Sequence, residues 1–240
     1  MKKYILYFLC FSLSFICINS CVNNPNVKRI TLHDTNNLKW VAIGNSIAWH
    51  PINSYWWGEY GMAASKRENG FVHVLNDKLK GIDPNASFKI AWSVDWERNH
   101  SGYDLSYFDE YFDGNESLVV IRLGENVTSL TNYESDLRLL VKHIKSLAPN
   151  AQIVISGVFM TASANLTAKD TAQKNVADSE NCVWLSLKEL DTTENRSKVG
   201  NQVMGDDGQL YSIDNPTVAD YPGDKGMEAI ADAIYNLIDF

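Results

Sequence analysis

The sequence predicts an α/β fold in which a parallel sheet is covered by helices on both faces. Five short apolar runs are continuous rather than alternating, which is typical of strands that are buried on both faces. The runs cover residues 40–46, 88–94, 118–124, 152–159 and 183–187. Helical patterns separate them, and strands that alternate with helices form right-handed βαβ units. We therefore expect one three-layer α/β/α sandwich with a five-stranded parallel sheet.

Four segments have helical patterns. They cover residues 71–81, 132–149, 169–179 and 223–240. Pro149 ends the second helix, and a turn at Pro222 and Gly223 precedes the last one. A short helical turn is also expected to begin at Ile47, directly after the first strand. In such sheets ligands bind at the carboxyl ends of the strands, so this edge is where we expect the chemistry.

The N-terminus resembles a bacterial export signal. Two lysines precede an apolar run from Tyr4 to Ile18, which is too short to span a bilayer and ends at a cleavage-like site. The segment Ile18-Asn19-Ser20-Cys21 resembles a lipobox, in which Cys21 receives lipid and becomes the mature N-terminus. The alternative is ordinary cleavage that leaves Cys21 as a spare thiol.

These features divide the chain into a signal peptide (1–20), a lipid-anchored tether (21–37) and one domain (38–240). We expect an exported bacterial lipoprotein, located in the periplasm or at the outer membrane or cell surface, which contacts the membrane only through its N-terminal lipid. Cys182 is then the one cysteine left in the domain, so neither an internal disulfide nor a multi-cysteine zinc site is expected. No metal site and no cofactor are predicted; the "DDG" at 206–208 is interpreted as a turn rather than a calcium loop.

The charge of the chain argues against nucleic acid as a partner. The formal net charge is −8, and the first twenty residues hold two lysines and no acid, so the chain from Cys21 has a net charge of −10. An acidic chain without a basic stripe is poorly suited to nucleic acid or anionic lipid.

Polar and small residues follow three of the predicted strands. Ser46, in "AIGNSIAWH", stands where a strand turns toward a helix, a placement that suits a nucleophile but also an ordinary N-cap. Asn126, in "LGENV", offers a side-chain amide donor, although Gly-x-Asn is also a common turn. Gly102 offers a backbone N–H after the second strand.

Taken in chain order, these residues resemble the SGNH (GDSL-like) hydrolases, including lipoprotein members from Bacteroidetes. The resemblance covers residues 38–240 and includes "WWGEYGMAAS" (56–65), "GDDG" (205–208) and "PGDKGMEAIA" (222–231). It implies a flavodoxin-like sandwich in which Ser46 is the nucleophile. It also implies that the Ser46 N–H, the Gly102 N–H and the Asn126 side chain form the oxyanion hole.

The sequence departs from the family at the catalytic histidine. The family places this residue in Asp-x-x-His before the last helix, where this chain has Val218 and Tyr221. A tyrosine has a pKa of about 10 and stays protonated at neutral pH, so it is a poor general base for a serine. His50, His100 and Asp220 are the candidates for a substitute base.

Four tryptophans near the predicted strand ends are candidates for a sugar-binding platform: Trp49, Trp56, Trp57 and Trp96. The alternative is that they pack in the core of the domain. The resemblance implies a serine esterase that removes small acyl groups, such as acetyl, from carbohydrate. The Tyr221 substitution leaves open a catalytically silent relative that binds acylated or plain glycan at the cell surface.

Overall fold

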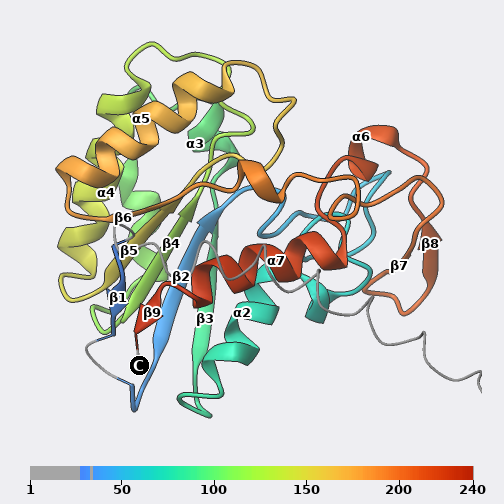
Figure 1. The fold of residues 1–240 in the computed structure, drawn as a ribbon, viewed down its shortest axis with the longest axis horizontal. Coiled ribbons are helices and arrows are strands. Elements are labelled where there is room, and N and C mark those ends of the chain that lie inside the picture. The colour runs from blue at the N-terminus through green and yellow to red at the C-terminus, as the bar shows by residue number, and fades with distance from the viewer. Residues whose placement is uncertain (1–27, 33–34, 240) are drawn as a thin grey trace, which may run out of the picture.

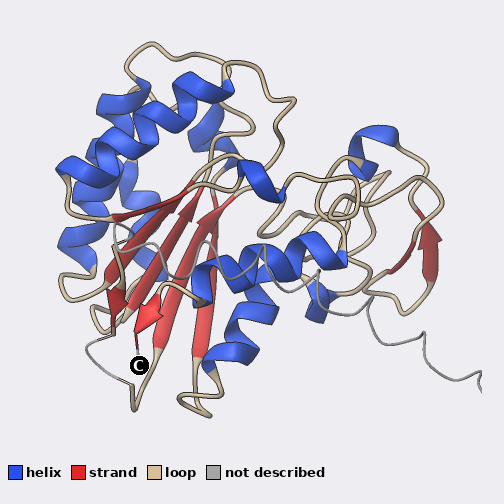
Figure 2. Ribbon diagram, viewed as in Figure 1, coloured by secondary structure: helices blue, strands red, loops and turns tan. Residues whose placement is uncertain are grey.

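The computed structural model describes residues 28–32 and 35–239. The predicted signal peptide and Cys21 lie outside the described residues. The main sheet consists of β2 (Lys39–Gly44), β3 (Ser87–Trp92), β4 (Leu118–Arg122), β5 (Gln152–Ser156) and β6 (Val183–Leu185). Its strands are all parallel and lie in the order β3-β2-β4-β5-β6 (Figures 1 and 2). The predicted three-layer sandwich with five parallel strands is confirmed.

Two pairs of helices cover the two faces of the sheet (Figure 1). Helices α2 (Phe71–Leu79) and α7 (Asp224–Tyr235) pack on one face, and α4 (Tyr133–Leu147) and α5 (Leu166–Ser179) on the other. Because successive side chains of a strand point to opposite faces, β2 contributes Trp40 and Ala42 to one apolar cluster and Val41 and Ile43 to the other. Continuous apolar runs are therefore needed in the central strands, whereas the edge strand β3 leaves Ser87 and Lys89 exposed.

Several short elements were not predicted. They are helices α3 (Val94–Arg98) and α6 (Pro216–Ala219) and the 3-10 helices η1 (Arg67–Asn69) and η3 (Lys188–Leu190). The aromatic segment that follows Gly102, expected to be helical, forms the 3-10 helix η2 (Leu105–Tyr111). The helical turn predicted from Ile47 is instead a tight turn over 45–48, in which the N–H groups of Ala48 and Trp49 donate to the Asn45 carbonyl at 2.8 and 3.1 Å. None of the described helices is long and apolar enough to cross a bilayer.

The boundary between tether and domain must be corrected. Strand β1 (Ile30–Thr31) pairs in parallel with β9 (Ile238–Asp239) near the C-terminus. Ile30 is fully buried, and its N–H donates to the Leu237 carbonyl at 2.8 Å. Residues 28–32, which we assigned to the tether, are therefore part of the folded domain. Their short apolar segment gave no periodicity from which a strand could be recognised.

A small lobe lies beside the carboxyl edge of β2 and consists of the loop 50–66 and the antiparallel hairpin β7 (Gln202–Met204) and β8 (Leu210–Ser212) (Figure 1). The Tyr60 hydroxyl donates to the Met204 carbonyl at 2.6 Å, and the Trp57 ring stacks on Tyr211 with 4.7 Å between centroids.

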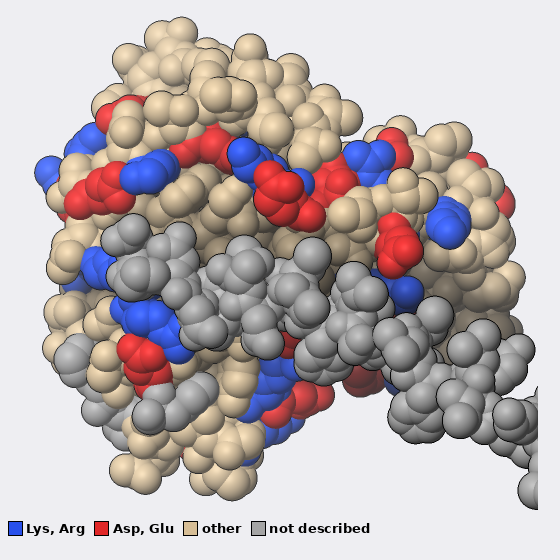
Figure 3. Space-filling model, in the orientation of Figure 1, with Lys and Arg blue, Asp and Glu red and all other residues tan. Residues whose placement is uncertain are grey.

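Basic and acidic side chains are interspersed on the face shown in Figure 3.

Candidate active site

Ser46 lies in the turn that follows β2, where the strand order of the sheet reverses between β2 and β4. Such a switch point is the usual ligand site of an open parallel sheet. Gly44 is required for this turn, because a Cβ there would lie 2.5 Å from the Cβ of Ala48. The Ser46 carbonyl accepts a hydrogen bond from the Met62 N–H at 2.8 Å, which joins the turn to the lobe.

Tyr221 meets Ser46 from the other side of the site. The Tyr221 side chain lies against Ser46, and burial raises the pKa of Tyr221 above its usual value. The backbone of Tyr221 is held by the Ser197 N–H, which donates to its carbonyl at 2.8 Å. The structure thus brings Ser46 and Tyr221 together. At neutral pH the Tyr221 hydroxyl keeps its proton and cannot accept the one from Ser46.

Asn126 follows β4 and is tied to a buried acid that the sequence analysis did not single out. The Asn126 Nδ2 donates to Glu97 Oε2 at 2.6 Å, and the Gly124 N–H donates to Glu97 Oε1. Glu97, on α3, is fully buried. Burial, together with the nearby charge of Glu125, raises its pKa to about 7.

A second buried acid is paired with an arginine. Glu125 takes two hydrogen bonds from the Arg122 guanidinium, at 2.7 and 2.5 Å. Although burial alone would raise the pKa of Glu125, Arg122 lowers it to about 2. Asn45 links the two acids, because its Nδ2 donates to Glu97 Oε1 at 3.0 Å and to Glu125 Oε2 at 2.8 Å. One polar network therefore lies under the turns that carry Ser46 and Asn126.

The sequence contained a signal for one half of this network. Arg122 interrupts an apolar strand that is buried on both faces, and a charge there must be paired. Glu125, three residues later, is its partner. Glu97 gave no such signal, because it stands in the polar segment "DWERNH" among residues that look exposed.

The structure describes no contact of Gly102 that would place it at the Ser46 turn. Gly102 is exposed in the turn after α3, and nothing lies within 4 Å of where its Cβ would be. The neighbouring Ser101 hydroxyl donates to Asp136 at the start of α4. Instead, Ser93 lies against the Ser46 turn, since its N–H donates to the Gly44 carbonyl at 2.9 Å. Helix α3 lies between Ser93 and Gly102 in the chain, and the role of Gly102 as an oxyanion donor stays a prediction.

The structure gives none of the proposed substitute bases a contact with Ser46. Both ring nitrogens of His100 are occupied, one by Asp136 at 2.7 Å and the other by the Ser129 carbonyl at 3.0 Å. His50 is bonded to the Pro51 carbonyl at 2.7 Å, and burial lowers its pKa. Asp220 is exposed and lies 3.4 Å from Arg196. The expectation that one of these residues serves Ser46 gains no support from these contacts.

The tryptophans divide into two groups. Trp56 and Trp96 are fully buried, so the sugar-platform prediction is wrong for these two, which are core residues. Trp49 and Trp57 are partly exposed; Trp49 packs edge-on against Trp92, with 5.3 Å between ring centroids. The described residues include no group of three or more histidine, cysteine or acidic side chains arranged to hold a metal ion.

Comparison with known proteins shows similarity in structure. No protein-family model matches the chain, and no curated protein matches it by sequence. A salicylyl-acyltransferase from a tetracycline biosynthetic pathway superposes with a TM-score of 0.54 at 13% identity, over 82% of this chain and 53% of that one. A two-domain esterase active on acetylated mannans gives 0.51 at 16% identity, over 82% and 48%.

A carbohydrate esterase family 2 enzyme with a carbohydrate-binding domain, from Corynascus thermopiles (Myceliophthora fergusii), gives a TM-score of 0.50 at 14% identity. This match covers 82% of this chain and 64% of the enzyme, and the chain spans about half the length of the other two proteins. These similarities establish the fold. The chain has the α/β sandwich that esterases and an acyltransferase of this type share.

Proposed function

We propose that this protein is a serine ester hydrolase of SGNH type, which removes small acyl groups such as acetyl from carbohydrate and turns over slowly at neutral pH. The observation that carries the proposal is the contact between the Ser46 and Tyr221 side chains at the carboxyl edge of the sheet. This contact places the Ser46 hydroxyl, the proposed nucleophile, beside the Tyr221 hydroxyl, at the edge of the sheet where open parallel sheets bind their ligands.

In the proposed reaction the Ser46 Oγ attacks the ester carbonyl and loses its proton to a base. Negative charge develops on the carbonyl oxygen, and donors aimed at that oxygen stabilise the transition state. Among the described residues, no partner is found for the Ser46 N–H. The Asn126 amide has two N–H groups, one of which is directed to Glu97. The sugar hydroxyl then leaves with a proton, and water hydrolyses the acyl-serine.

The weak step is the transfer of the Ser46 proton. A tyrosine hydroxyl accepts a proton only as tyrosinate, and burial raises the pKa of Tyr221 further. A positioned base contributes about 10²–10⁴-fold to the rate. Oxyanion and binding interactions alone leave about 10³–10⁴-fold over water when a member of the triad is missing. A slow but Ser46-dependent hydrolysis is the expected behaviour.

The substrate class is proposed from two supports. The structurally similar proteins include an esterase active on acetylated mannans and a carbohydrate esterase. Trp49 and Trp57 are also partly exposed, although Tyr211 covers one face of the Trp57 ring, and flat apolar faces suit sugar rings. The expected lipid at Cys21 would hold the domain outside the cytoplasm, where glycans are found.

A second candidate function is a glycan-binding protein that does not hydrolyse its ligand. The observation that favours it is the absence, among the described residues, of a histidine that contacts Ser46. The binding site would be the same, with Ser46 and Tyr221 as hydrogen-bonding groups.

Assaying the purified protein and its Ser46→Ala variant on an acetylated manno-oligosaccharide separates the two functions. Hydrolysis that Ser46→Ala abolishes supports the esterase. Absence of hydrolysis together with saturable binding of the oligosaccharide by calorimetry supports the binding protein. If the protein neither hydrolyses nor binds the oligosaccharide, both candidates are wrong for this substrate class.

A further inference from the structure

Glu97 is an acid in an unusual environment, because it is fully buried and has no cation as a direct partner among the described residues. Burying an uncompensated carboxylate costs several kcal/mol. A second acid, Glu125, lies close enough to raise its pKa, which adds to that cost. A strongly perturbed acid at the functional edge of a sheet is a candidate for a functional role.

The carboxylate is held by donors alone. Glu97 Oε1 accepts hydrogen bonds from the Gly124 N–H, from the Asn126 backbone N–H at 3.4 Å and from Asn45 Nδ2 at 3.0 Å. Glu97 Oε2 accepts a hydrogen bond from Asn126 Nδ2 at 2.6 Å. The two loops that contact it are the turn that carries Ser46 and the turn that carries Asn126.

This contact fixes which way the Asn126 amide faces. The amide has a donor side and an acceptor side, and flipping it would put its oxygen against the Glu97 oxygen. With Nδ2 held by Glu97, the second N–H of the same nitrogen is the group left to meet a ligand. Without the Glu97 carboxylate, no hydrogen bond at this place would distinguish the two orientations of the Asn126 amide.

The same acid helps to hold the nucleophile turn, together with the Arg122–Glu125 pair. Asn45 Nδ2 donates to Glu97 at 3.0 Å and to Glu125 at 2.8 Å. Asn45 Oδ1 accepts the Ile47 N–H at 3.2 Å and Arg122 Nη1 at 3.3 Å. The hydrogen bond from the Ile47 N–H closes the turn around Ser46. Glu97 therefore connects the position of the nucleophile with the position of the proposed oxyanion donor.

We propose that Glu97 is a positioning residue that orients the Asn126 amide and the Ser46 turn toward the acyl oxygen of the substrate. The kinetic consequence of this role rests on the proposed esterase function. The orientation of Asn126 can be measured whether or not the protein is an esterase. Glu97 touches no reacting atom and acts through Asn126 and Asn45.

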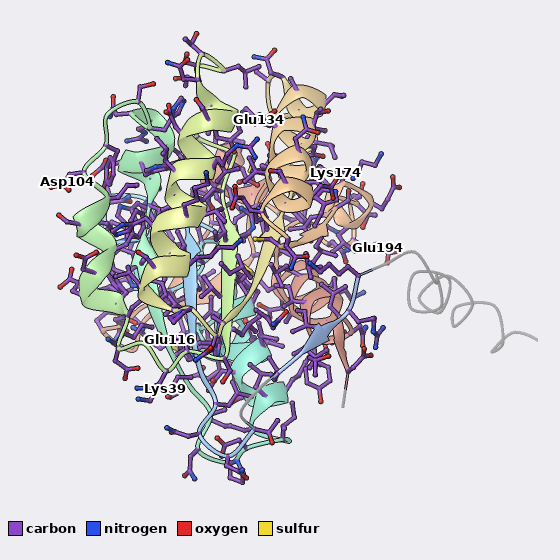
Figure 4. All side chains as sticks on the ribbon, turned by 90° about the vertical axis from the view of Figure 1, so that its left-hand side faces the viewer. Lys39, Asp104, Glu116, Glu134, Lys174 and Glu194 are labelled. Carbon is purple, nitrogen blue, oxygen red and sulfur yellow. The ribbon has the colours of Figure 1, made fainter. Side chains whose placement is uncertain are left out.

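The variant that tests this role is Glu97→Gln, which keeps the shape but puts an NH₂ group against one of the donors. Glu116→Gln is a matched control, since Glu116 is also a buried acid capped by backbone N–H groups, those of Asp113 and Gly114. It precedes β4 and lies with Lys39 at the other end of the sheet (Figure 4).

The first readout is the NMR signal of the Asn126 side-chain amide, assigned by its loss in Asn126→Ser. We expect Glu97→Gln to shift this signal and to speed its exchange with water at least tenfold, while Glu116→Gln leaves it unchanged. An Asn126 signal that Glu97→Gln does not move contradicts the proposal, whether or not the protein is an esterase.

The second readout is acetyl-ester hydrolysis. We expect Glu97→Gln to lower kcat about 10²-fold, the effect of losing one oxyanion donor, with KM changed less than about threefold. A fall in kcat matched by Glu116→Gln, or a change confined to KM, would overturn the kinetic role. If the wild type shows no Ser46-dependent hydrolysis, the proposed function fails, and the NMR result alone decides whether Glu97 orients Asn126.

If Glu97→Gln does not fold, a pH titration of the wild-type protein replaces it. Burial and Glu125 raise the pKa of Glu97 to about 7. The other titratable or charged groups around it are Arg122 beside Glu125, Tyr133 on α4, Lys169 on α5 and Tyr221. Glu97 is therefore expected to titrate near pH 7. The Asn126 amide signal should shift around that pH, and a signal that stays constant would refute the contact.

Discussion

Replacing Tyr221 with histidine is the substitution that addresses the proton-transfer step most directly. The Tyr221 side chain already reaches the Ser46 hydroxyl, so a histidine at the same position would place an imidazole next to that hydroxyl. The Tyr221 backbone is held by Ser197 and by the bridge between Pro222 and Arg196, neither of which depends on the side chain.

The expected gain follows from the fraction of each side chain that can accept a proton. At pH 7 an ordinary tyrosine is ionised in about one molecule in 10³, and burial of Tyr221 lowers that fraction. A histidine with an ordinary pKa of about 6.5 is mostly neutral at the same pH. A positioned base contributes about 10²–10⁴-fold, so kcat should rise by that factor. We expect the lower end, because Val218 provides no carboxylate to orient the imidazole.

The assay is hydrolysis of an acetyl ester at pH 7 by the wild type, Tyr221→His, and the double variant Tyr221→His with Ser46→Ala. A gain of at least about 10² that disappears in the double variant is the predicted result. Adding Val218→Asp should raise the rate further. A Tyr221→His variant that folds and gains nothing would refute the assignment of this position as the place of the base.

Three further predictions concern stability. Arg122→Met leaves Glu125 buried without its partner and should lower the free energy of unfolding, measured by urea denaturation, by about 3–5 kcal/mol. A loss under about 1 kcal/mol would mean that the ion pair is replaceable. Ile30→Ala should lower the free energy of unfolding by about 2–4 kcal/mol if β1 belongs to the domain. No measurable loss would mean that residues 28–32 are part of the tether. Because the pKa of Glu97 is about 7 in the folded protein and about 4.5 when unfolded, the folded state binds its proton more tightly. The stability of the wild type should therefore fall by about 2.5 kcal/mol relative to Glu97→Gln as pH rises from 5 to 8, and parallel pH curves for the two proteins would contradict that pKa.

The layers of the fold could be predicted from the sequence, because strands covered on both faces must be apolar at every position. The runs around Val41 and Val119 meet that condition, and their order along the chain determines a parallel sheet. The elements that were missed, such as β1 and the hairpin β7–β8, have only two or three residues per strand. Elements this short are stabilised by tertiary contacts rather than by local pattern.

The site could be predicted where a residue has a fixed offset from a strand end. Ser46 is of this kind, whereas Tyr221 was placed by its position before the last helix, and the structure brings the two together. Gly102 was placed by chain order, and the sequence did not reveal the short helix α3 that precedes it. Glu97 could not be found from its neighbours, because its burial is produced by the packing of α3 against two turns that are distant in sequence.

The central claim is that Tyr221 occupies the place of the base and that its protonation limits the reaction of Ser46. The measurement that tests it is the pH dependence of acetyl-ester hydrolysis between pH 6 and 10.5 for the wild type, with the rate of Ser46→Ala subtracted at each pH. The Ser46-dependent rate should rise steadily to the alkaline limit, because tyrosinate forms only above the ordinary pKa of about 10. A plateau reached near pH 7 would show that a histidine or a carboxylate serves Ser46 and would contradict the account.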